Sequence, residues 1–169
     1  MKLVLLLFAT SMLSLAAPAP ETATNQATPA ATNFWRQTRK GPHIRAQFEG
    51  RSPCGEIRQL LNVPGHDDCI KIKWQLILFQ DPVTQAPTTY ALGGFLWRNP
   101  PKTGKWSIAK GTKEDPNAIV YQLDPDQPHP FLSFTPADEN ILLFLGRDRE
   151  LLVGNAKFSY TLNRIAENK

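Results

Sequence analysis

The stretch that decides the fold is Ile70–Gln80, which reads IKIKWQLILFQ. Its even-numbered residues up to position 78 are apolar and fall on one face: Ile70, Ile72, Trp74, Leu76 and Leu78. Lys71, Lys73 and Gln75 fall on the other face. Successive side chains of a strand point to opposite faces, so this alternation is typical of a half-buried β-strand. We therefore expect a long strand with Trp74 in the core.

Other segments of the chain carry strand patterns of the same kind, and turns rich in Pro, Gly, Asn and Asp separate them. They are 43–48, 89–98, 105–110, 118–124, 131–135, 141–145 and 157–164. Only Gly55–Val63 has apolar residues at helical spacing. The sequence predicts one all-β domain over residues 41–166, a small antiparallel barrel of about eight strands with one short helical excursion. A barrel is favoured because closure removes exposed strand edges.

The segment Ile141–Leu145, ILLFL, is apolar on both faces. Such a strand is either buried on both sides or forms a partner surface. The adjacent aromatic residues Phe34 and Trp35 are candidates for covering it.

The first residues resemble an export signal. Lys2 precedes an apolar stretch that is too short to span a membrane, and the small residues Ala16 and Ala17 offer a cleavage site. We expect residues 1–17 to be a signal peptide and residues 18–40 to be a disordered linker. No cysteine lies near the cleavage site for lipid attachment. The mature chain is therefore expected to be periplasmic or secreted, without a membrane anchor.

Cys54 and Cys69 are the only cysteines of the chain. In an oxidising compartment, two lone cysteines about 15 residues apart indicate one structural disulfide. Neither has a partner at C-x-x-C spacing, which argues against redox or copper chemistry.

Charge and motifs disfavour several functions. The formal charge of +4 falls to +3 without Lys2, which is low for a nucleic-acid-binding protein. The chain has no G-x-S-x-G or H-E-x-x-H motif and no glycine-rich phosphate loop. Its three histidines are scattered. We expect no enzymatic activity, no cofactor and no specific metal site.

Large aromatic residues recur on the expected strands, and two interpretations remain open. They either fill a small barrel core or line an apolar pocket for a lipid or another small hydrophobic ligand. The candidate pocket residues are Trp74, Tyr90, Trp106, Tyr121 and Tyr160.

Three motifs occur in the order found in one known family. The segment 48–54, FEGRSPC, resembles the opening of the N-terminal domain of the NlpE-type copper-resistance and envelope-stress lipoproteins. Gly104-Lys105-Trp106 is similar to a strand start of that family, and the segment 158–162, FSYTL, is similar to its last strand. The resemblance implies a lipocalin-like barrel in the bacterial cell envelope.

The chain also departs from the family pattern. Ile57 stands where the second cysteine of a C-x-x-C motif would be expected, and the lipoprotein cysteine is missing. We therefore expect an exported, non-enzymatic barrel that binds or senses a small hydrophobic ligand or an envelope protein. The alternatives are a copper-handling or redox protein of the NlpE type and a protein-interaction module.

Overall fold

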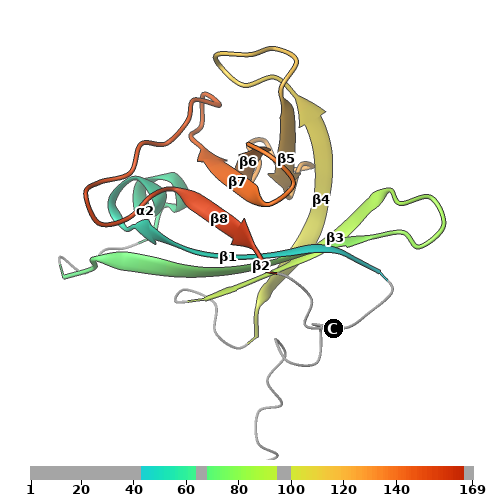
Figure 1. The fold of residues 1–169 in the computed structure, drawn as a ribbon, viewed down its shortest axis with the longest axis horizontal. Coiled ribbons are helices and arrows are strands. Elements are labelled where there is room, and N and C mark those ends of the chain that lie inside the picture. Colours follow the sequence, from blue (N-terminus) through green and yellow to red (C-terminus); the bar gives the residue numbers. More distant parts are fainter. Residues whose placement is uncertain (1–42, 64–67, 95–99, 166–169) are drawn as a thin grey trace, which may run out of the picture. The chain divides into compact units, whose positions relative to one another are not determined.

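The computed structural model describes residues 43–63, 68–94 and 100–165 (Figure 1). These residues belong to one compact unit. The expected signal peptide and linker lie outside the described residues, and so do Phe34, Trp35 and Trp97.

The described chain forms an antiparallel barrel that closes on itself, with the strands arranged in sequence order. Its elements are β1 (Ile44–Pro53), α2 (Gly55–Leu61), β2 (Lys71–Gln80), β3 (Pro87–Gly94), β4 (Lys102–Lys110), β5 (Ile119–Leu123), β6 (Leu132–Pro136), β7 (Ile141–Leu145) and β8 (Thr161–Arg164). The predicted eight-stranded barrel with one short helix is confirmed.

The barrel closes where β8 pairs with β1, through Phe48 opposite Arg164 and Gly50 opposite Leu162. Glycine is required at position 50 because a Cβ atom there would collide with the carbonyl oxygen of Thr161. The alternation in the sequence predicted a first strand of 43–48, with Gly50 just beyond its end. The structure corrects this, since the glycine lets the two strands approach and β1 continues to Pro53.

The last strand is shorter than predicted, because it begins at Thr161 rather than at Lys157. The side-chain oxygen Oδ1 of Asn155 accepts hydrogen bonds from the backbone N–H groups of Lys157 and Phe158. This local turn takes the N–H groups that a strand ladder would use.

The register of β2 is confirmed. Trp74 is 1% exposed and Ile72, Leu76 and Leu78 are equally buried, whereas Lys71 and Lys73 are exposed. Ile70 was wrongly assigned to the core face. It is 67% exposed, because pairing with β1 begins only at Lys71.

Connections between consecutive strands of an antiparallel meander fall at alternate ends of the barrel. Figure 1 shows α2 and the β2–β3 turn at opposite ends of the strands β1 and β2. At the α2 end, Ile57 is fully buried in the core, and Leu60 and Leu61 pack against it. The helix therefore closes this end of the barrel.

Strand β7 is buried on its inner face but only partly on its outer face, so neither expected alternative, full burial or a partner surface, holds completely. Leu142 and Phe144 enter the core, and Leu145 on the other face is also buried. Ile141 and Leu143 are half-buried.

No helix among the described residues has the length and apolar character needed to cross a membrane.

Candidate functional site

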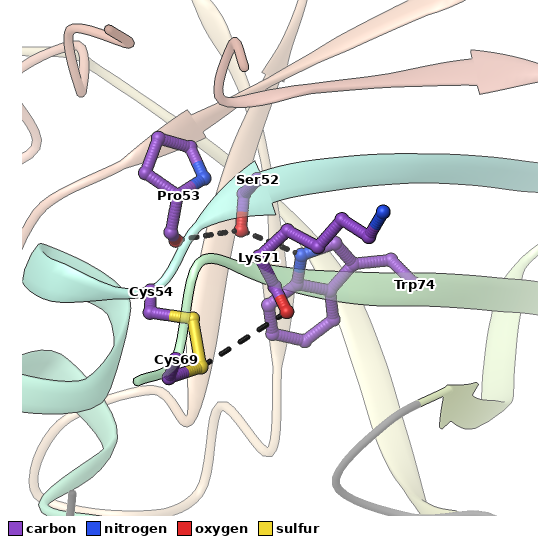
Figure 2. Close-up of a disulfide and its surroundings, with 6 residues drawn as sticks. All are labelled: Ser52, Pro53, Cys54, Cys69, Lys71 and Trp74. Atoms are coloured by element: carbon purple, nitrogen blue, oxygen red, sulfur yellow. Dashed lines mark hydrogen bonds between the residues drawn. A yellow bond between two sulfur atoms is a disulfide. The ribbon is translucent and has the colours of Figure 1, made fainter. Parts of the chain in front are cut away.

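Cys54 and Cys69 form the predicted disulfide, with their Cα atoms 6.0 Å apart (Figure 2). Cys54 immediately precedes α2, and Cys69 lies two residues before β2. The bond therefore ties the beginning of the helix to the wall of the barrel. A helix of seven residues is unstable on its own, so the tether fixes the position of α2.

Trp74, Tyr90, Trp106 and Tyr160 belong to the core cluster of the barrel, and Trp74 and Tyr160 both contact Phe144. Ring centroids are 5.2 Å apart for Trp74 and Phe144, 4.7 Å for Phe134 and Phe144, and 6.3 Å for Phe144 and Tyr160. Trp74, Trp106, Tyr90 and Tyr160 are all buried. A cluster of buried side chains thus fills the interior formed by the described residues.

Tyr121 differs from the other candidates. It is half-buried, and its ring lies edge-on to Trp106 with the centroids 5.3 Å apart. Phe134 and Phe144, which were not among the predicted interior residues, also belong to the core, each at an inward position of a short apolar strand.

Three of the buried aromatics, Trp74, Trp106 and Tyr90, form hydrogen bonds with other residues of the barrel. Trp74 Nε1 donates to Ser52 Oγ at 2.8 Å, as Figure 2 shows, and Trp106 Nε1 donates to the carbonyl oxygen of Phe79 at 2.6 Å. The Tyr90 hydroxyl donates to Asp124 Oδ2 at 2.9 Å. These donors are therefore already engaged without a ligand.

Asp124 is the centre of a small polar cluster that was not predicted from the sequence. Its Oδ2 atom lies 3.0 Å from Lys102 Nζ, and this ammonium group lies 4.5 Å from the ring centroid of Phe131. Gly104 leaves room for the carboxylate, since a Cβ atom there would collide with it. Burial raises the pKa of Tyr90 well above its usual value of 10, and the hydrogen bond to Asp124 adds to the effect.

A groove of about 420 Å³ lies on the outside, beside α2. It is lined by Glu56, Gln59, Leu60, Gly146, Arg147, Glu150, Leu151, Leu152 and Val153. Two of its apolar residues are open to solvent, Leu151 at 43% exposure and Val153 at 79%. An apolar surface of this kind is typical of an interaction site when polar residues surround it.

Glu150 gives the groove an unusual acceptor. Its carboxylate lies against Gly146, and its Oε2 atom is buried without a hydrogen-bond partner. An unpaired buried acceptor destabilises a fold by about 1–3 kcal/mol. No signal in the sequence marks Glu150, because the groove forms only when the β7–β8 connection meets α2.

A second, larger groove of about 700 Å³ follows the outer face of β8, β1, β2 and β3, and it is mainly polar. Arg51 and Lys73 face each other there across the β1–β2 pair. Beside them, Gln75 Nε2 donates to Glu49 Oε1 at 2.9 Å.

Within residues 43–63, 68–94 and 100–165, no three histidine, cysteine, aspartate or glutamate side chains converge in a way that could hold a metal ion. His66 and Asp67 lie outside the described residues.

Together these features define a class, namely a closed antiparallel barrel with a filled interior and one end covered by a disulfide-tethered helix. Comparisons with protein-family models, curated proteins and solved structures found no match. The resemblance to the NlpE-type family therefore stays a prediction.

Proposed function

We propose that this chain is an exported, non-catalytic binding protein of the bacterial cell envelope that binds through the outside of its barrel. The observation that carries the proposal is the filled interior. Trp74, Phe144 and Tyr160 occupy the space that a hydrophobic ligand would need. A ligand could enter only by displacing buried aromatic side chains, which costs packing energy.

The outer surface offers a more suitable site. The groove beside α2 combines exposed apolar side chains with charged groups, as the surfaces of protein-interaction sites do. Of the two ligand classes expected from the sequence, an envelope protein therefore fits better than a small hydrophobic molecule.

A titration with a brominated fatty acid tests this preference. Bromine quenches tryptophan fluorescence at short range, so a fatty acid inside the barrel would quench Trp74 and Trp106. We expect no saturable quenching by the natively folded protein. Stoichiometric, saturable quenching would contradict the proposal and would favour a ligand-binding pocket inside the barrel.

Copper handling is the competing function that the family resemblance implies. Soft Cu(I) prefers thiolate and thioether ligands. Both cysteines are in the disulfide, and both methionines, Met1 and Met12, belong to the expected signal peptide. We expect a Cu(I) titration of the mature, disulfide-bonded protein to show no tight binding, and one tightly bound equivalent would favour the copper function instead.

A further inference from the structure

The chemistry of the groove beside α2 specifies what could fill it. Leu60, Leu151 and Val153 supply an apolar floor and rim, whereas Glu56 and Glu150 supply carboxylates. The groove's cation, Arg147, already donates from Nη2 to the carbonyl oxygen of Leu60 at 3.2 Å. The buried Oε2 atom of Glu150 lacks a donor. A complementary occupant would place large apolar side chains next to cationic hydrogen-bond donors.

One segment of this chain outside the described residues has that composition. Residues 33–42 read NFWRQTRKGP, in which two adjacent aromatics are followed by three cations and no acidic residue. Phe34 and Trp35 would cover the apolar rim, and Arg36, Arg39 and Lys40 would face the carboxylates. Aromatic residues and arginine are also the side chains most enriched in binding hot spots.

The length of residues 33–42 decides whether the segment can dock in the groove of its own molecule or only in that of a second copy. It joins the barrel at the beginning of β1, whereas α2 follows the end of β1, ten residues further along. Ten residues of strand span about 33 Å, and the eight residues from Trp35 to His43 span at most about 29 Å when fully extended. A segment stretched in this way would leave its cations along the barrel wall, away from Glu56 and Glu150.

We propose that residues 33–42 of one molecule dock in the groove beside α2 of a second copy, with Phe34 and Trp35 on the apolar rim and the cations at Glu56 and Glu150. This inference rests on the proposed function, since it names an occupant for the same outer surface.

The oligomeric state of the full mature chain tests the inference by sedimentation over a range of protein concentrations. We expect reversible self-association that Leu151→Asp with Val153→Asp weakens by at least about tenfold. Both residues are exposed, so the variant should fold, as circular dichroism can verify. The matched control is Val83→Asp, which changes an apolar residue of 87% exposure on the β2–β3 turn and should leave association unchanged.

Two further variants separate charge from shape. Glu150→Gln keeps the shape and removes the charge, and Gly146→Ala keeps the charge but displaces the carboxylate. Both should weaken association several-fold.

A charge exchange identifies the contact directly. Reversing Arg36, Arg39 and Lys40 to Glu should abolish association, and adding Glu56→Lys and Glu150→Lys should restore it. A chain that stays monomeric at all concentrations would overturn the inference. So would the variant with Arg36, Arg39 and Lys40 reversed to Glu if it associates like the wild type. The proposed function would stand in that case, because the fatty-acid titration tests it separately.

Discussion

The two ends of the barrel are closed by different means. At the α2 end, a helix of seven residues covers the core and a disulfide holds it in place. At the other end, short turns join the strands, and Ile108 and Ile119 remain about half exposed although they share a face with core residues. A short helix needs a covalent tether, whereas a turn holds itself by local hydrogen bonds. The long connections of the tethered end also build the groove.

The largest effect is expected from Trp74→Ala, which removes a fully buried ring beside the tethered end and leaves the Ser52 hydroxyl without its partner. Loss of the ring and the resulting cavity should lower the free energy of unfolding by about 3–5 kcal/mol in urea titrations. The control is Lys73→Ala on the same strand, which should change it by no more than about 0.5 kcal/mol. Equal effects of the two changes would mean that the assigned register of β2 is wrong.

Removal of the disulfide should destabilise the α2 end of the barrel more than the other end. Replacing Cys54 and Cys69 with alanine opens a loop of 15 residues and should cost about 3 kcal/mol. Amide hydrogen exchange should then rise first in α2, while the β2–β3 turn keeps its protection. Uniform loss of protection over the whole barrel would show that the tether does not act locally.

High pH should weaken the fold through Tyr90. Its pKa is raised in the folded protein, so above pH 10 the unfolded chain loses a proton that the folded chain keeps. The free energy of unfolding should then fall with rising pH, by up to about 1.4 kcal/mol per pH unit for this group. Tyr90→Phe should reduce that slope, and an unchanged slope would assign it to other groups.

Much of this architecture could be predicted from the sequence, and the exceptions have local causes. Alternation placed Trp74 and its neighbours correctly because β2 is long and half-buried on one face. The disulfide followed from two lone cysteines and an expected export signal. Gly50 was misread because a glycine in a strand marks either a break or a close approach, and only the β8 partner decides which.

The candidate site was harder to predict. The aromatic residues could be identified, but whether they enclose a cavity depends on Phe134 and Phe144 from distant strands. The Asp124 cluster and the groove at Glu150 bring together segments that are far apart in the chain, so no local sequence pattern predicts them.

The smallest effect is expected at the other end, in the β2–β3 turn. Asp81 Oδ1 accepts hydrogen bonds from the N–H groups of Val83 and Thr84 and from the Thr84 hydroxyl, and these bonds lower the pKa of Asp81. The turn's contribution should be present above pH 4 and disappear as the pH falls through this lowered pKa. Asp81→Asn should remove that acid dependence and change the free energy of unfolding little at neutral pH. A large loss of stability at neutral pH would mean that Asp81 stabilises more of the barrel than this turn.

Site-specific photocrosslinking tests the central claim, binding through the outside of the tethered end, most directly. A photoreactive residue would replace Val153 in the groove, or Val83 on the opposite end as the control, in protein expressed in living cells. We expect protein adducts at Val153 and none at Val83, with adducts of twice the chain's mass if a second copy is the partner. Adducts at Val83 alone, or equal adducts at both positions, would contradict the account.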